Sequence, residues 1–131
     1  MRVLIIEDNE IKLNKTIKYL KDSSKLPLDI HTANTVQLAK RFLKQNQYDR
    51  IIIDMQLPTI AGRGIDQEGG ISILLYLPIT MNENTKRVIN SSSDETRDVL
   101  DRNNFKNEIL IINNSARNNS SEFDKFINTG G

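Results

Sequence analysis

The sequence predicts an α/β fold in which a five-stranded parallel sheet carries helices on both faces. Two observations predict it. Short continuous apolar runs are typical of strands buried on both faces, and apolar residues recur at helical spacing between these runs. Strands that alternate with helices imply right-handed crossovers and a parallel sheet. A length of 131 residues, 37% of them hydrophobic, fits a single domain over residues 1–131.

Five apolar runs predict the strands. Each run is rich in β-branched residues or leucine and is bounded by polar residues, and the second run is the weakest of the five. The predicted strands cover residues 3–6, 28–32, 51–53, 88–89 and 109–112.

Five segments between and after these strands have helical spacing. In the first of them Leu13, Ile17 and Leu20 share one face, and acidic residues near the start of the fourth suit the helix dipole. The predicted helices cover residues 10–21, 35–45, 70–77, 94–103 and 120–128. The connection over residues 57–70 is long for its place and contains several glycines, which is typical of a functional or flexible loop.

Composition and charge exclude several classes of protein. The formal net charge of +1, from 18 basic and 17 acidic residues, argues against direct binding of nucleic acid. The absence of cysteine excludes disulfides and thiolate metal sites. The first apolar run is too short for a signal peptide, and no stretch has the length of a membrane span. We therefore expect a soluble cytoplasmic protein that does not bind membranes.

Acidic residues follow two of the predicted strands. Glu7 and Asp8 come directly after the first strand, and Asp54 comes directly after the third. Ligands of open parallel sheets bind at the carboxyl ends of the strands, so these three carboxylates converge if the first and third strands are neighbours. Their repulsion raises at least one pKa unless a cation lies among them, and Mg²⁺ prefers such oxygen ligands. A carboxylate can also act as a nucleophile toward a phosphoryl group.

Residues 3–10 and 51–58 resemble the opening and the phosphorylation strand of bacterial response-regulator receiver domains. The resemblance extends from residue 1 to about residue 127. It implies a flavodoxin-like (βα)5 sheet with the strand order 2-1-3-4-5 and a role in two-component signalling. It also implies a histidine kinase or phosphotransfer protein as the phosphoryl donor, and a downstream effector protein as the partner.

The resemblance implies a role for each residue of the acidic group. Asp54 matches the phosphorylated aspartate. Asp8 matches the direct Mg²⁺ ligand, and Glu7 matches the acid that reaches the metal through water. Gln56 matches the position whose backbone carbonyl completes the metal site. The competing interpretation is that acids at strand ends are solvated loop residues or helix caps.

After the fourth and fifth strands the sequence departs from the family pattern or leaves its register open. Ser92, with Ser91 as the alternative, matches the hydroxyl that contacts the phosphoryl group, although a turn or helix-cap role fits Ser92 as well. Asn113 occupies the place of the family's lysine and brings no charge. Leu110 occupies the aromatic switch position. These departures question phosphorylation-driven switching more than the fold.

Three functions remain in competition. The first is a receiver that accepts a phosphoryl group at Asp54 with Mg²⁺ and modulates a partner. The alternative is a phosphorylation-independent pseudo-receiver that serves as a protein-interaction module. A phosphohydrolase is disfavoured because Gln56 occupies the place of the usual second acid, so we expect no enzyme. The lysines at positions 12, 15, 18 and 21 are expected to form a solvated helix face, and the oligomeric state is open.

Overall fold

A five-stranded parallel sheet organises the computed structural model, which describes residues 1–91, 95–105, 110–113 and 120–129. The order of its strands is β2-β1-β3-β6-β7, which confirms the predicted order 2-1-3-4-5 because β4 and β5 form a separate hairpin. The strands of the sheet are β1 (Arg2–Ile6), β2 (Asp29–Ala33), β3 (Arg50–Ile53), β6 (Lys86–Ser91) and β7 (Leu110–Asn113). Each lies where an apolar run predicted it, with residue 109 outside the described part.

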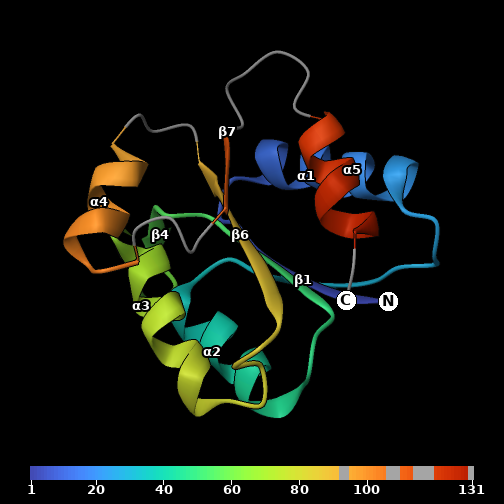
Figure 1. Cartoon of the computed structure of the whole chain (residues 1–131). Coiled ribbons are helices and arrows are strands. Elements are labelled where there is room, and N and C mark those ends of the chain that lie inside the picture. The colour runs from blue at the N-terminus through green and yellow to red at the C-terminus, as the bar shows by residue number, and fades with distance from the viewer. Residues whose placement is uncertain (92–94, 106–109, 114–119, 130–131) are drawn as a thin grey trace.

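Helices cover both faces of this sheet, as predicted (Figure 1). On one face lie α1 (Glu10–Ser23) and α5 (Ser120–Asn128), which pack side by side. On the other lie α2 (Val36–Gln45), α3 (Gly69–Tyr76) with the 3₁₀ turn η1 (Leu77–Ile79), and α4 (Thr96–Arg102). Of the predicted fourth helix, residue 94 lies outside the described residues. No helix of the described segments is long and apolar enough to cross a membrane.

The apolar strands divide their side chains between two cores. In β1, Val3 and Ile5 join the core beneath α1 and α5, whereas Leu4 and Ile6 join the core beneath α2, α3 and α4. The exposed fraction of these four side chains is 1% or less. Because both faces of the strand are covered, a continuous apolar run is required there rather than an alternating one.

The segment between β3 and α3 contains structure that the sequence did not predict. A short antiparallel hairpin joins β4 (Leu57–Pro58) to β5 (Ile65–Asp66), and Gly62 in its connection has a φ of 80°, which favours glycine. The backbone N–H of Gln37, at the start of α2, donates to the carbonyl of Thr59 at 2.9 Å. The long connection is therefore partly ordered by its own strands and by α2.

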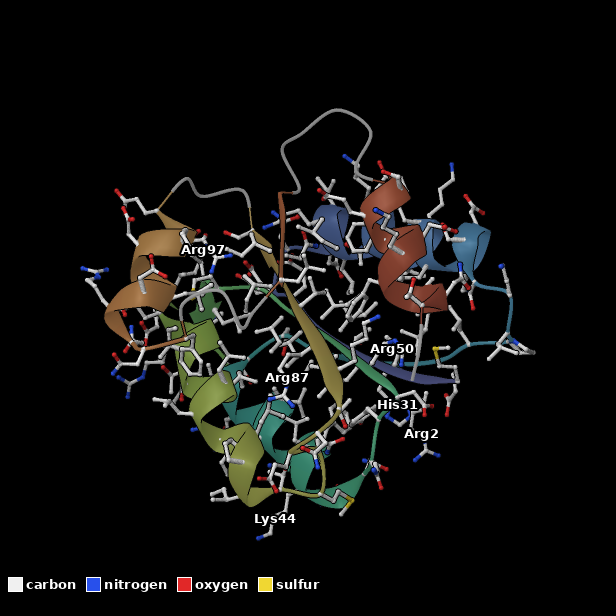
Figure 2. All side chains as sticks on the ribbon, in the orientation of Figure 1. Arg2, His31, Lys44, Arg50, Arg87 and Arg97 are labelled. Carbon is white, nitrogen blue, oxygen red and sulfur yellow. The ribbon has the colours of Figure 1, made fainter. Side chains whose placement is uncertain are left out.

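Two buried polar side chains hold the amino end of the sheet together. The guanidinium of Arg50 (Figure 2) donates to the carbonyls of Phe126 at 3.0 Å and Thr129 at 3.0 Å. It thus provides hydrogen-bond donors for main-chain carbonyls at the carboxyl end of α5. Asn82 is fully buried, and its amide donates to the carbonyls of Leu43 and Asn46 at 2.9 and 2.7 Å. Its side-chain oxygen accepts from two further groups, the N–H of residue 48 and the hydroxyl of residue 85.

Candidate functional site

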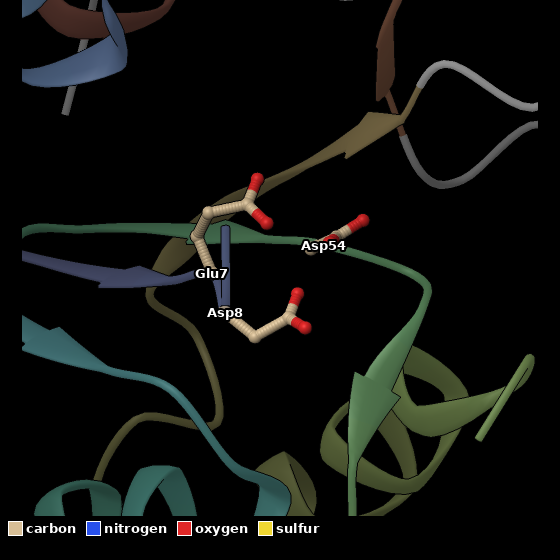
Figure 3. A group of neighbouring side chains, drawn as sticks. All are labelled: Glu7, Asp8 and Asp54. Carbon is tan, nitrogen blue, oxygen red and sulfur yellow. The ribbon is translucent and has the colours of Figure 1, made fainter. Parts of the chain in front are cut away.

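Three carboxylates meet at the carboxyl end of β1 and β3. These strands pair in parallel with Ile6 opposite Ile53, so the residues that follow them lie next to each other, and the N–H of Asp54 donates to the carbonyl of Ile6 at 2.9 Å. One oxygen each of Glu7, Asp8 and Asp54 lies within 4.8 Å of the others, and Figure 3 shows the three side chains directed into one space. The predicted convergence is confirmed.

The three acids differ in their contact with solvent. Only 3% of Glu7 and 4% of Asp54 is exposed, whereas Asp8 is half-buried at the rim. The backbone N–H of Gln56 donates to Asp54 Oδ1 at 3.4 Å, and that of Asn9 donates to Glu7 Oε2 at 3.3 Å. Glu7 Oε1 is buried without a hydrogen-bond donor in the described part of the chain. An ionised carboxylate in this position is costly unless a cation approaches it.

Burial raises the pKa values of both Glu7 and Asp54. Burial raises the pKa of Glu7 to about 8, reinforced by a hydrogen bond to Asp54 and by the negative charge of Asp54, while the charge of Lys12 acts in the opposite direction. Burial also raises the pKa of Asp54, against the hydrogen bond from Glu7 and the charge of Lys12. The predicted pKa rise occurs, with burial as its main cause and repulsion as a smaller one.

The residues present fit a hard divalent cation. Such a cation takes oxygen ligands and keeps several waters, and the three carboxylates supply oxygens at compatible spacing. Among the described residues, the buried Glu7 Oε1 has no hydrogen-bond donor, although Lys12 Nζ lies 3.5 Å away, and a divalent cation would stabilise its negative charge further. Adjacent to the acids, a hollow of about 260 Å³ is lined by Glu7, Asp8, residues of α1 and α2, and the end of β2 with the loop after it.

Glycines allow α3 to begin close to the end of β3. The N–H of Gly70 donates to the carbonyl of Met55 at 2.8 Å, and a Cβ at Gly70 would lie 2.8 Å from the carbonyl oxygen of Asp54. A Cβ at Gly69 would lie 2.9 Å from Leu57. Both distances are too short for any side chain, so the approach that fixes the backbone at Asp54 requires glycine.

Lys12 is a site residue that the sequence interpretation missed. It was expected on a solvated face, but its Nζ lies 3.5 Å from Glu7 Oε1 and 3.7 Å from Asp54 Oδ2, and its side chain is only 31% exposed. The expectation was wrong because side chains in a helix lean toward its amino terminus, where the acids lie. Of the other three lysines, Lys18 and Lys21 are exposed, and Lys15 lies over the ring of Tyr19.

The remaining predicted site residues have mixed outcomes. Ser91 ends β6, and its hydroxyl accepts from the hydroxyl of Thr96 in α4 at 2.7 Å. Ser92 lies outside the described residues. Gln56 lies in the turn after β3, and its side-chain amide donates to Gln67 at 2.8 Å. The role of its carbonyl, like the roles of Ser91 and Ser92, stays a prediction.

The structure describes the positions of Asn113 and Leu110, the two residues of β7 that depart from the family pattern. Asn113 ends β7, in register with Ser91 of β6. Leu110 begins β7 and is 52% exposed. Leu110 therefore presents an apolar side chain at the edge of the sheet, where the family resemblance implies an aromatic residue.

No protein-family model matches the chain. An uncharacterized protein of Sinorhizobium fredii (strain NBRC 101917 / NGR234), y4jS, is 34% identical over 74 residues. The matched stretch is 56% of this chain and 18% of that relative, so the chain spans less than a fifth of the relative's length.

Solved structures of response regulators match nearly the whole chain. The bacteriophytochrome response regulator RtBRR has a TM-score of 0.74 at 17% identity, over 99% of this chain and 79% of that one. The receiver domain of the Francisella response regulator 1452 has a TM-score of 0.67 at 22% identity, over 97% and 93%. The Mn²⁺-bound form of response regulator Rcp1 has a TM-score of 0.67 at 16% identity, over 96% and 88%. The fold is that of receiver domains.

Proposed function

We propose that this chain is a two-component receiver that accepts a phosphoryl group on Asp54 with the help of Mg²⁺ and thereby modulates a partner protein. The observation that carries the proposal is the meeting of Glu7, Asp8 and Asp54 at the carboxyl ends of β1 and β3, within a receiver fold. Ligands of doubly wound sheets bind at this edge. The Mn²⁺ bound by Rcp1 is a property of that protein, and it supports a divalent cation here.

In the proposed reaction, a carboxylate oxygen of Asp54 attacks the phosphorus of a phosphohistidine on a histidine kinase or phosphotransfer protein. A P–O bond forms and the P–N bond breaks, and its electron pair remains on the imidazole nitrogen, which takes up a proton. The N–H of Gln56 orients the carboxylate through Asp54 Oδ1. Burial raises the pKa of Asp54, whereas the hydrogen bond from Glu7 and the charge of Lys12 lower it, so these two side chains favour the ionised nucleophile.

Asp8 and Asp54 would hold the Mg²⁺ together with the Gln56 carbonyl, and Glu7 would contact it through water. When bound, the metal neutralises negative charge on the transferring phosphoryl oxygens. Ser92, or Ser91 in its place, would contact the phosphoryl group from the end of β6. The hydrogen bond from Thr96 to Ser91 connects α4 to the end of β6, and an effector would bind the exposed side of α4.

The test is a titration of ¹⁵N-labelled protein with Mg²⁺ and then with beryllofluoride, a stable mimic of the phosphoryl group. Amide resonances at positions 8, 54 and 56 should shift with Mg²⁺, and a second set around β6 and α4 should shift with beryllofluoride. The Asp54→Asn variant should lose the second response. If the amide resonances of wild-type protein shift with neither reagent, the receiver function is rejected and the interaction module remains.

A receiver of this kind would act in the cytoplasm, without direct contact to membranes or nucleic acid. Its net charge of +1 fits partners that are proteins. It would be a signalling domain rather than an enzyme with turnover on free substrates. Prolonged incubation with a generic phosphomonoester and Mg²⁺ should therefore release no more phosphate than a sample without protein.

A further inference from the structure

The acidic site contains a positively charged side chain, that of Lys12, which comes from α1 and not from a strand of the sheet. Lys12 Nζ forms ion pairs with Glu7 Oε1 and Asp54 Oδ2 at 3.5 and 3.7 Å. Within the described residues, no other basic side chain forms an ion pair with these acids. Lys12 does not pair with Asp8, so it approaches the group from the side of Glu7 and Asp54.

The local structure fixes Lys12 in this position at a cost to the helix. Asn9 caps α1, and its Oδ1 accepts from the N–H of Lys12 at 3.1 Å, which places Lys12 in the first turn. A positive charge in the first turn opposes the helix dipole, which favours acids there. A residue that breaks a local rule without a gain in packing is a candidate for a functional role, and the two ion pairs are the compensating interaction.

The charges of the proposed reaction require such a cation. Three carboxylates and a phosphoryl group carry more negative charge than one divalent cation neutralises. The end of β7, where the family resemblance implies a lysine, carries the neutral Asn113. Lys12 Nζ already lies 3.7 Å from Oδ2 of the Asp54 carboxylate, the group to which the phosphoryl group would be attached.

We propose that Lys12 is the residue that binds the phosphoryl group on Asp54, exchanging its contact with the carboxylates for one with a phosphoryl oxygen. This inference rests on the proposed receiver function. It predicts that removal of Lys12 changes the affinities for Mg²⁺ and for the phosphoryl group in opposite directions. The positive charge of Lys12 repels an incoming Mg²⁺ but attracts the anionic phosphoryl group, so its removal should strengthen the first interaction and weaken the second.

The experiment compares wild-type protein with Lys12→Gln, Lys12→Arg and the control Lys18→Gln. Lys18 is an exposed lysine of the same helix, so its substitution changes the net charge equally without touching the site. Mg²⁺ affinity is measured first by amide shifts. Beryllofluoride affinity is then measured at a Mg²⁺ concentration that saturates each variant, so that a change in metal binding does not enter the second value.

Lys12→Gln should bind Mg²⁺ about threefold more tightly and beryllofluoride about tenfold more weakly, as expected for a partly buried charge contact. Lys12→Arg should keep most of the beryllofluoride affinity, and Lys18→Gln should match wild type in both. A structural role alone would not produce opposite changes. If Lys12→Gln changes both affinities in the same direction, or neither, the inference is overturned while the receiver function stands.

A failure of the receiver function itself gives a different result. If wild-type protein binds neither reagent but Lys12→Gln gains Mg²⁺ binding, Lys12 occupies the place of the metal, and its role in holding a phosphoryl group is refuted. If neither protein binds Mg²⁺, both the receiver function and the inference are rejected.

Discussion

The two ends of the sheet bury polar groups in opposite ways. At the amino end, Arg50 and Asn82 are buried, and the hydrogen bonds they make satisfy main-chain carbonyls of several elements. At the carboxyl end, Glu7 and Asp54 are equally buried, but one oxygen of Glu7 has no hydrogen-bond donor among the described residues, and burial raises both carboxyl pKa values. Hydrogen bonds to internal partners stabilise the first end, whereas the acids of the second end have fewer partners and would be stabilised further by a divalent cation.

The largest expected effect is at the amino end. Asn82→Ala removes the side-chain partner of the buried N–H of Tyr48, the buried carbonyl of Leu43 and the partly buried carbonyl of Asn46, so the free energy of unfolding should fall by about 3 kcal/mol. Denaturant unfolding followed by circular dichroism measures it. Asn84→Ala, in the same turn but exposed, is the matched control and should change little. If Asn82→Ala barely lowers the free energy of unfolding, or if the folded variant loses Mg²⁺ binding, the two ends of the sheet do not have the separate roles described above.

At the carboxyl end, removal of a charge should stabilise the metal-free protein. The pKa of Glu7 rises from 4.5 unfolded to about 8 folded, so the folded state retains a proton that the unfolded state releases. Stability therefore falls as the pH rises from about 4.5 to 8, and the full penalty is present above pH 8.

Glu7→Gln removes this penalty and keeps a hydrogen-bond donor to Asp54. The metal-free variant should be more stable than wild type by on the order of 2–3 kcal/mol above pH 8, with the difference shrinking toward pH 4.5. Unfolding curves across this range, without divalent cations, measure the effect. Glu10→Gln, an exposed acid of the same segment, should show no such trend. Equal pH profiles for Glu7→Gln and wild type would show that Glu7 ionises normally.

The close approach of α3 gives a third, smaller effect. Gly70→Ala adds a Cβ 2.8 Å from the carbonyl oxygen of Asp54, so the helix or the strand end must shift, at a cost of about 2 kcal/mol. Gly64→Ala is the control, because no atom of the described residues lies within 4 Å of the position that its Cβ would take. The Gly70 variant should also bind Mg²⁺ more weakly, while a variant with unchanged stability and affinity would show that the approach is not tight.

The smallest effect is again at the amino end. Tyr48→Phe removes the hydroxyl that lies 2.8 Å from His31 Nδ1, and should lower the free energy of unfolding by about 1 kcal/mol. Denaturant unfolding measures this change. Mg²⁺ affinity should stay at the wild-type value. A changed affinity would mean that the two ends of the sheet are coupled.

The sequence predicted those features that depend on strand burial. Residues 3–6 and 51–53 are continuously apolar because both faces of β1 and β3 are covered, and parallel strands bring their carboxyl ends to one edge. The meeting of Glu7, Asp8 and Asp54 follows from these two facts. The strand order followed from the family resemblance rather than from periodicity.

The features that were not predicted depend on side-chain reach in three dimensions. Asn82 lies in a turn and has the sequence character of a loop residue, yet its side chain joins this turn to the distant residues 43–48. The hairpin of β4 and β5 pairs too few residues to leave a pattern. Lys12 left one available signal, a basic residue in the first turn of a helix that follows two acids, which the helix dipole disfavours.

The most direct measurement of the receiver assignment is the mass and location of a phosphoryl group after incubation with acetyl phosphate. The carboxylate of Asp54 should displace acetate from phosphorus only when Mg²⁺ is present. Intact mass spectrometry should then show one added phosphoryl group, and peptide mapping after reduction of the acyl phosphate should place it at Asp54. Modification that needs no Mg²⁺, persists in Asp54→Asn, or never forms would contradict the assignment.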